Sequence, residues 1–235
     1  MLNFHIISIF PESFESYLNS SILKRAQTAG LIKIELYNLR DFTLDKHRKV
    51  DDRPYGGGPG MVMAVEPIIR AVEAIQKKIV KSFSDSSLKA KSQKLKAKVI
   101  LFAPGGKEFN NQIAEKLSKS KVVKHLILIC GHYEGIDARV KKILKAEEYT
   151  IGPYVLTGGE LPAMIMVDSI TRRIPGVLGN DISLEEKRAS ASEEMYTRPE
   201  IFAYQGKNFR VPKVFLSGHH KKIEEYKQAK KKFTP

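Results

Sequence analysis

Two glycine-containing segments have the composition and placement of ligand-binding loops. Residues 130–135 (CGHYEG) follow the apolar run 125–130, and residues 151–159 (IGPYVLTGG) follow a short predicted strand over 148–151. In open α/β sheets, ligands bind beyond the carboxyl ends of the strands. Glycines there let a ligand approach the backbone, whose N–H and C=O groups can recognise an adenine edge. A single glycine is more often a turn or a helix cap, but two such loops on successive strands favour a ligand site.

The sequence lacks the motifs of the common nucleotide and metal sites. The run 105–107 (GGK) is followed by Glu108 and has no leading glycine, so it is not a phosphate loop, and Met61 interrupts the only candidate dinucleotide fingerprint. There is no HExxH and no GxSxG. The six histidines, including the adjacent pair 219–220, lack ligand spacing. ATPases, Rossmann dehydrogenases, metalloenzymes and α/β-hydrolases are therefore disfavoured, and no metal ligand is predicted.

The charge balance points to a polyanionic partner. The 235 residues include 40 Lys and Arg against 26 Asp and Glu, a formal net charge of +14. Such an excess favours nucleic acid or an anionic membrane surface. No apolar stretch approaches the roughly 20 residues that span a bilayer, and the N-terminus does not have the features of a signal peptide. Nucleic acid is therefore the favoured partner, and the single cysteine, Cys130, suits the cytoplasm.

Apolar periodicity predicts alternating strands and helices, and hence a parallel α/β sheet with helices on both faces. The predicted strands are 4–10, 31–38, 99–103, 125–130 and 148–151, and the predicted helices are 13–29, 66–80, 109–117, 136–144 and 160–173. We expect a glycine-rich loop over 40–63, an exposed Lys- and Ser-rich insertion over 77–98, and a polar linker over 180–194. The tail has few strand signals and a basic helix near 221–232.

Seven separated segments, in order, resemble the bacterial tRNA (guanine-N1)-methyltransferase family of the TrmD type. They are SIFPESF (8–14), RDFTLDKHRKVDDRPYGGGPGM (40–61), CGHYEGIDAR (130–139), IGPYVLTGGELPAM (151–164), DSITRRIPGVLG (168–179), YTRPE (196–200) and VPKVFLSGHH (211–220). The resemblance covers nearly the whole chain. It implies transfer of a methyl group from S-adenosylmethionine to N1 of the guanosine 3′ of the anticodon in tRNA.

The resemblance also implies an architecture that the hydrophobic pattern of the sequence does not predict. We expect a SPOUT-type parallel α/β domain over 1–178 with a C-terminal trefoil knot that holds the cofactor. A flexible linker over 179–195 and a small helical tRNA-binding domain over 196–235 would follow. The family further implies a homodimer with the active site at the subunit interface. It implies a preference for Mg²⁺ as well, for which this sequence offers no assignable site.

The resemblance assigns the glycine-containing loops and the end of the preceding strand to the cofactor. The predicted cofactor residues are Leu101, Pro104, Gly131, Tyr133, Glu134, Gly135, Ile151, Gly152, Pro153, Tyr154, Val155, Leu156, Gly158 and Gly159. Pro153 departs from the usual family aspartate. Because the adenine would be recognised by backbone groups, its binding should not depend on the side chain at 153. The lost carboxylate, however, alters the contacts available to the methionine end of the cofactor or to a metal.

The segment 51–61 (DDRPYGGGPGM) is expected to hold the target guanine. Asp51 or Asp52 could accept hydrogen bonds from the guanine N1–H or amino group, and Arg53 could bind a phosphate. Gly60 permits close approach of the base, and Tyr55 is a further substrate candidate. The two prolines stiffen the glycines, whereas a plain flexible linker would be rich in Ser and Gly. A splayed base in a pocket fits recognition of the anticodon stem-loop, with affinity that falls steeply with salt.

The chemistry requires a base for the guanine N1 proton and a cation or N–H donor for the charge that grows on O6. Arg172 matches the family's arginine and fits the second role. Its alternative role is a structural ion pair with Asp168 on the helix surface. Counted without gaps, the family's linker carboxylate falls on Lys187, which cannot serve. Glu186 is therefore the predicted base, with its neighbour Glu185 and the earlier Asp181 as alternatives.

Two other functions remain open from the sequence alone. One is another SPOUT-class RNA methyltransferase that acts on a different base or RNA. The other is a non-catalytic RNA-binding relative, which the altered linker makes conceivable. The segment 40–61 favours the guanine-N1 enzymes over the first alternative.

Overall fold

The structure, a computed structural model, describes residues 1–82, 96–179 and 194–229. The chain divides into two compact units, Met1–Gly179 and Asn180–Pro235. The centre of the expected Lys- and Ser-rich insertion and most of the expected linker lie outside the described residues, and so do Glu185 and Glu186. None of the described helices is long and apolar enough to cross a membrane.

The first unit is built on a five-stranded parallel sheet, which confirms the predicted α/β class. The strands are β1 (Leu2–Ser8), β2 (Ile32–Asn38), β5 (Lys96–Glu108), β6 (Val123–Ile129) and β7 (Glu147–Thr150). Their order is β2-β1-β6-β5-β7, and every neighbouring pair is parallel. The central strands β1 and β6 are mostly buried along their length, which is typical of strands covered on both faces, whereas β2 and β7, at the edges, are only partly buried.

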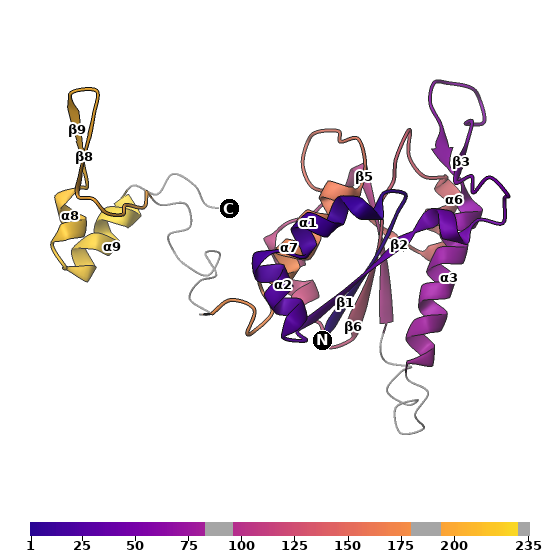
Figure 1. The fold of residues 1–235 in the computed structure, drawn as a ribbon, viewed down its shortest axis with the longest axis horizontal. Helices are drawn as coiled ribbons and strands as arrows, with labels where there is room; N and C mark the ends of the chain where they lie inside the picture. Colours follow the sequence, from indigo (N-terminus) through magenta and orange to yellow (C-terminus); the bar gives the residue numbers. More distant parts are fainter. Residues whose placement is uncertain (83–95, 180–193, 230–235) are drawn as a thin grey trace. The chain divides into compact units, whose positions relative to one another are not determined.

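Helices cover both faces of this sheet (Figure 1). On one side lie α1 (Glu15–Leu18), α2 (Ser21–Thr28), α5 (Asn111–Ser118) and α7 (Glu160–Thr171), and on the other lie α3 (Val65–Lys81) and α6 (Ala138–Leu144). Strand β6 shows why two cores form. Leu126 and Leu128 belong to the core on the α7 side, whereas Ile127 and Ile129 belong to the core under α3. Successive side chains of a strand point to opposite faces, so one buried strand contributes to both cores.

The predicted helix over 13–29 is broken in the structure. A 3₁₀ turn, η1 (Pro11–Phe14), leads into α1, and α2 begins only at Ser21. At the break the Ser20 hydroxyl donates to the carbonyl of Tyr17 at 2.9 Å. Serine and asparagine side chains compete in this way for the backbone bonds of a helix. Both short helices still face the same core, so the apolar spacing of four continues across the break.

Strand β5 is longer than predicted because it has two successive partners. It pairs with β6 from Lys96 to Leu101 and with β7 from Ile100 to Phe102, and after a bulge it pairs with β7 again at Lys107 and Glu108. Pro104 lies in the bulge, where a missing N–H costs no ladder bond.

The predicted loop over 40–63 contains little regular structure, as expected. A 3₁₀ turn, η2 (Leu39–Phe42), opens it, and the two-residue strands β3 (Asp51–Asp52) and β4 (Val62–Met63) pair antiparallel near its end. The pairing closes residues 53–61 into a loop.

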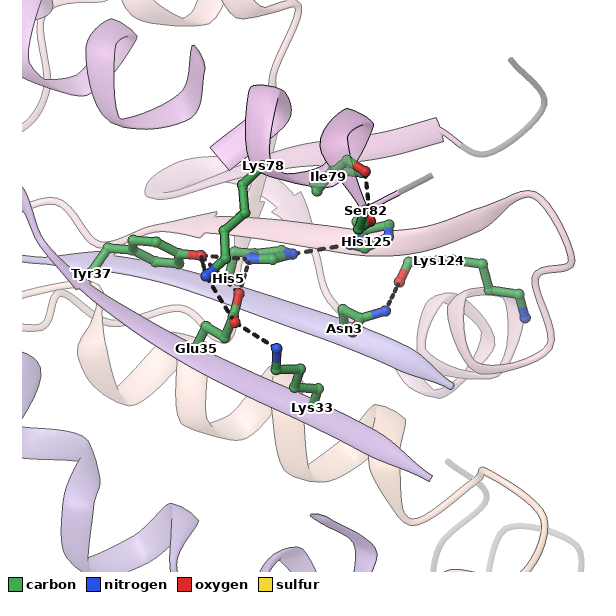
Figure 2. Close-up of polar contacts among 10 residues, drawn as sticks. All are labelled: Asn3, His5, Lys33, Glu35, Tyr37, Lys78, Ile79, Ser82, Lys124 and His125. Atoms are coloured by element: carbon green, nitrogen blue, oxygen red, sulfur yellow. Dashed lines mark hydrogen bonds and ion pairs between the residues drawn. The ribbon is translucent and has the colours of Figure 1, made fainter. Parts of the chain in front are cut away.

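A buried polar cluster lies in the core under α3 (Figure 2). Nε2 of His5 on β1 lies 3.0 Å from Nδ1 of His125 on β6. Nδ1 of His5 lies 3.2 Å from the Tyr37 hydroxyl and 3.2 Å from a Glu35 carboxylate oxygen, both on β2. Burial, followed by the neighbouring His125, lowers the pKa of His5 to about 4. The imidazole is therefore neutral in the folded protein at neutral pH.

Glu35 completes this cluster as a carboxylate. Burial by itself raises the pKa of Glu35, but hydrogen bonds from Lys33, Lys78 and Tyr37 outweigh it and lower the pKa to about 2. Nζ of Lys78, from α3, lies 3.0 Å from the carboxylate, so the cluster ties the helix to the edge strand β2.

The second unit contains a hairpin that the sequence did not predict. Strands β8 (Ile201–Tyr204) and β9 (Lys207–Arg210) pair antiparallel, and helices α8 (Lys213–Leu216) and α9 (His220–Ala229) follow. Both residues of the turn, Gln205 and Gly206, have positive φ. Such a turn matches the twist of the strands.

Candidate functional site

A cavity of about 410 Å³ lies at the carboxyl ends of β6 and β7 and beside the bulge of β5. Its walls come from residues 101–104, from the segment 131–138 after β6, and from the segment 148–162 around and after β7. The volume lies in the range of small-molecule sites, and the position is where open α/β sheets bind ligands. The two loops that the sequence singled out thus meet around one cavity.

Most of the predicted cofactor residues line this cavity. They are Leu101, Pro104, Gly131, Tyr133, Glu134, Gly135, Ile151, Tyr154, Val155, Leu156, Gly158 and Gly159. Gly152 and Pro153 do not line it. The Gly152 carbonyl accepts a hydrogen bond from the Thr150 hydroxyl at 2.9 Å, so this part of the loop folds back on Thr150.

The other wall residues were not among the predicted cofactor residues, although His132 and Thr157 lie within the two loops that the sequence singled out. They are Phe102, Ala103, His132, Ile136, Asp137, Ala138, Lys141, Glu148, Tyr149, Thr150, Thr157 and Pro162. Most are neighbours of predicted residues and could have been included on that ground. Lys141 and Glu148 are different, because they form an ion pair between α6 and β7 that cannot be predicted from the local sequence.

Backbone contact between the two loops explains the glycine pair 158–159. The Gly159 N–H donates to the Gly131 carbonyl at 2.8 Å, and Gly158 pairs with His132 in an isolated bridge. A Cβ on Gly159 would lie 2.6 Å from Cα of Cys130. Only glycine fits so close to another backbone, so this wall depends on the residue type at 159.

A buried carboxylate supports the same wall. Glu160, the first residue of α7, is 8% exposed. It accepts a hydrogen bond from the Ser8 hydroxyl at 2.6 Å, and its other oxygen lies 2.9 Å from Nε2 of His132. A carboxylate at a helix N-terminus interacts favourably with the helix dipole. Burial, with Glu160 nearby, also raises the pKa of the Cys130 thiol well above its ordinary value.

The loop that contains 51–61 is attached to the cavity wall by its backbone. The Glu134 N–H donates to the Met61 carbonyl at 3.0 Å, and the Met63 N–H donates to the Gly135 carbonyl at 2.9 Å. Gly60 has φ +78, and a Cβ there would lie 2.5 Å from Oε1 of Glu134. The end of this loop therefore abuts a side chain that lines the cavity.

The other predicted substrate residues lie along the same loop, and none of the five lines the cavity. Asp51 and Asp52 form β3, and Oδ1 of Asp52 accepts from the N–H of Arg53 at 2.8 Å. Arg53 is exposed and Tyr55 is fully exposed. The structure therefore presents Arg53 and Tyr55 to solvent.

Arg172 lies away from the cavity of its own chain. It is the C-cap of α7, whose first turn forms part of the wall. At 1.5 Å of rise per residue, Arg172 is about 18 Å along the helix from Glu160. Arg172 and the cavity are therefore separate within one chain.

Asp168, which the sequence offered as an ion-pair partner of Arg172, accepts a hydrogen bond from the Tyr17 hydroxyl at 2.6 Å. This bond, followed by burial, raises the pKa of Tyr17 to about 12.

The described residues contain no group of three or more His, Cys, Asp or Glu side chains that could hold a metal ion.

The fold and the cavity define a parallel α/β protein with a small-molecule site at its strand ends. The family model described as "tRNA (Guanine-1)-methyltransferase TrmD" matches residues 2–234. The chain belongs to this family.

Named relatives and a solved structure agree with the match. The tRNA (guanine-N(1)-)-methyltransferase of Carboxydothermus hydrogenoformans is 47% identical over 228 residues, which cover 95% of this chain and 80% of that protein. The protein of the same name from Dictyoglomus turgidum is 48% identical over 231 residues, covering 97% and 84%. The crystal structure of tRNA (m1G37) methyltransferase from Aquifex aeolicus is 34% identical, with a TM-score of 0.73 and coverage of 97% and 88%.

Proposed function

We propose that the chain methylates tRNA, transferring a methyl group from S-adenosylmethionine to N1 of the guanosine 3′ of the anticodon. The observation that carries this proposal is the match over residues 2–234 to the methyltransferase family, in a chain whose glycine loops enclose one cavity. The named relatives cover nearly its whole length. The net charge of +14 suits a tRNA substrate.

S-adenosylmethionine would occupy the cavity between the glycine loops, with the wall residues described above as its contacts. When bound, it supplies the methyl group. The apposed backbones of 130–135 and 151–159 offer N–H and C=O groups to an adenine, and Gly158 and Gly159 leave room for close approach. We extend the proposal to a trefoil knot in the C-terminal part of the first unit. The proposal gives Mg²⁺ no site among the described residues.

The chain's own residues would hold the guanine and move its proton. The loop 51–61, through Asp51, Asp52, Arg53, Tyr55 and Gly60, would bring the base to the cavity, an assignment that the attachment of Met61 to Glu134 supports. Glu186 would take the N1 proton, with Glu185 as the alternative. Arg172 would offset the negative charge that develops on guanine O6, since a fixed cation stabilises such charge most where water is excluded.

A homodimer with the active site at the subunit interface would bring these groups together. The exposed side of α7 supports this proposal, because Leu161 and Ile165 lie there at 55% and 44% exposure. Val155, on the cavity wall, is 80% exposed. Apolar side chains gathered at a site mark protein contact surfaces. Arg172 follows Leu161 by 11 positions. Because 11 residues are close to three helical turns, Arg172 lies on the same side of the helix as Leu161.

The proposed division of labour follows the two units. Residues 1–178 would bind the cofactor and carry out transfer, residues 179–195 would act as a linker, and residues 196–235 would bind tRNA. We place the protein in the cytoplasm, where its proposed substrate is found.

The test is methyl transfer from labelled S-adenosylmethionine to a tRNA transcript with guanosine 3′ of the anticodon, with the product mapped by nuclease digestion and mass spectrometry. The expected product is N1-methylguanosine at that position, and a transcript with adenosine there should remain unlabelled. Label on another base would support a different SPOUT-class activity. Binding of tRNA without transfer would support a non-catalytic RNA-binding protein.

A further inference from the structure

The hairpin of the second unit presents three exposed aromatic side chains on one face. Phe202 and Phe209 are directly opposite each other in the β8–β9 register, and so are Tyr204 and Lys207. Alternate residues of a strand share a face, and cross-strand partners share it too. Phe202, Tyr204, Phe209 and Lys207 therefore form one face, here called the aromatic face. Its three rings are each 56% or 57% exposed.

The second unit uses other aromatic residues for its own packing. The rings of Tyr196 and Phe215 lie 5.2 Å apart, and those of Phe215 and Tyr226 lie 5.5 Å apart, edge to face. The aromatic face makes no comparable contact with these helices among the described residues. Its rings contact each other instead, since Phe202 and Tyr204 stack at 6.4 Å with 13° between their planes. Both strands are exposed along their whole length.

The charges around the aromatic face are positive. Lys207 lies on this face and Arg210 on the opposite face of the hairpin, and residues 201–210 contain no acidic residue. Residues 194–229 contain seven Lys and Arg against four Glu. Exposed aromatic rings combined with basic side chains are the pattern by which proteins bind single-stranded nucleic acid. The bases stack on the rings and the cations meet the phosphates. An isologous contact with a second copy would instead bring two Lys207 side chains to the same surface.

We propose that the aromatic face is a stacking platform for an unpaired base of the tRNA, with Lys207 beside it for a phosphate. The inference rests on the proposed tRNA substrate and adds a contact surface that the catalytic assignment does not contain. The side chains of Phe202 and Tyr204 provide the flat surface, and Phe209 extends it across the hairpin. The opposite face, with Ile201, Ala203, Asn208 and Arg210, has no aromatic residue and provides the control.

A fluorescence experiment reads the platform directly, because the chain contains no tryptophan. In the full-length Phe202→Trp variant, a tRNA titration should quench the single tryptophan as a base stacks on it. In Ile201→Trp, on the opposite face, the quench should be much weaker. Equal or absent quenching in both variants, while filter binding shows that tRNA is bound, overturns the proposal. Emission that instead depends on protein concentration without tRNA assigns the face to a second copy and overturns it as well.

Substitution gives an independent measure. The double variant Phe202→Ala, Tyr204→Ala should raise the Kd for tRNA by about tenfold to a hundredfold, the range expected from loss of one stacked base. Binding of S-adenosylmethionine and the transfer rate at saturating tRNA should stay near wild type. Ile201→Ala is the matched control, and Tyr204→Phe should retain most of the affinity. An unchanged Kd in the double variant contradicts the platform.

These outcomes separate the two proposals. Wild-type protein that binds tRNA with the tryptophan quench but never transfers a methyl group refutes the proposed function and leaves the platform standing. Transfer to guanosine N1 with no response at residue 202 does the reverse.

Discussion

Three glycines mark where the loops around the cavity come closest, and each is required for a different reason. Gly159 needs space, since its neighbour is the backbone of Cys130, but its φ is ordinary. Gly158 lies against the side chains of His132 and Glu160. Gly60 has both a positive φ and a close neighbour, Glu134. The sequence predicts these glycines as points where a ligand or base approaches closely. In the structure the Cys130 backbone excludes a larger residue at position 159, whereas at position 60 the exposed Glu134 side chain would have to move.

Gly60 can be tested against a glycine of almost the same conformation. Gly57 has φ +80, compared with +78 at Gly60, but a Cβ on Gly57 would meet nothing within 4 Å. Gly57→Ala therefore suffers only backbone strain in an exposed loop, and transfer should fall by no more than about tenfold. Gly60→Ala must also displace Glu134 at the cavity wall, so transfer should fall by a further factor of about ten or more. Steady-state kinetics with tRNA and with S-adenosylmethionine measure both, and equal losses in the two variants refute the contact.

The proposed base is tested by removing its carboxylate while keeping its shape. Glu186→Gln should slow single-turnover methyl transfer by roughly 10²-fold or more, because a general base contributes about that much. Glu185→Gln should have a smaller effect. Lys187→Asp in the Glu186→Gln background should restore part of the rate if a carboxylate in this segment is what matters. Wild-type rates in both Glu→Gln variants would place the base elsewhere.

Long-range partners account for what the sequence could not predict at this scale. Ser8 and Glu160 are 152 positions apart and meet only because β1 and the start of α7 lie together in the fold. No spacing rule relates such residues. The loop residues of 130–135 and 151–159 could be predicted because strand ends carry their own signal in glycine and apolar pattern.

At the scale of the elements, the register of β1 against β2 and β6 sets the environment of His5. It places the imidazole beside Glu35 and Tyr37 on one strand and near His125 on the other (Figure 2). Lys33 and Lys78 also face this group. A buried, hydrogen-bonded imidazole with two cations nearby is stable as the neutral form, so acid should weaken this part of the fold.

The sign of the pH effect follows from linkage. The ordinary pKa of His5 is 6.5, and the folded-state pKa is lowered to about 4. As the pH falls from about 6.5 to about 4, the unfolded chain takes up a proton that the folded chain refuses, so the free energy of unfolding falls, by on the order of 2 kcal/mol. Glu35 adds its own loss only at lower pH, between its ordinary pKa of 4.5 and about 2.

Urea unfolding at a series of pH values, followed by circular dichroism, measures this slope. His5→Phe should flatten the decline between about pH 6.5 and 4, although His125, whose pKa burial also lowers, keeps part of it. His47→Gln, at an exposed position, is the control and should retain the wild-type slope. A slope in His5→Phe that equals that of wild type would show that the buried histidine does not govern acid stability.

The elements themselves were largely predictable, and the departures have local causes. Strong apolar periodicity identified the strands and the long helix α3, whose predicted range 66–80 compares with Val65–Lys81. The break before α2 was hidden because both short helices keep the same spacing against one core. The β8–β9 hairpin was missed because its strands bury nothing within their unit, so they lack the alternation of apolar and polar residues that reveals a half-buried strand.

At the scale of the whole molecule, one chain holds the parts of the proposed active site in separate places. The first turn of α7 forms part of the cavity wall, whereas Arg172 caps the other end of that helix. An exposed apolar side of α7 runs between them. A two-fold arrangement of copies could supply each cavity with an arginine from the other chain, and most small oligomers have such symmetry.

Mixing two inactive variants tests this arrangement. Arg172→Ala removes the cation, and Leu156→Trp fills the cavity from a position that is already 36% exposed, so each variant should fold but fail to transfer methyl groups. If each site combines one chain's cavity with the other chain's arginine, the mixed dimer keeps one intact site. Random mixing should then restore about a quarter of wild-type activity, since half of the dimers are mixed and each has one working site of two.

The control is a chain with both substitutions, mixed with Arg172→Ala. No combination of these two chains provides an intact cavity together with an arginine from the other copy, so activity should stay absent. Native mass spectrometry of differently tagged chains would verify that mixed dimers form in every sample. Mixed dimers without recovered activity would mean that Arg172 acts within its own chain or not at all, and a failure to find dimers would refute the interface. Recovery only in the complementary pair is the result that the separation of Arg172 from the cavity leads us to expect, because α7 holds the two about 18 Å apart in every copy.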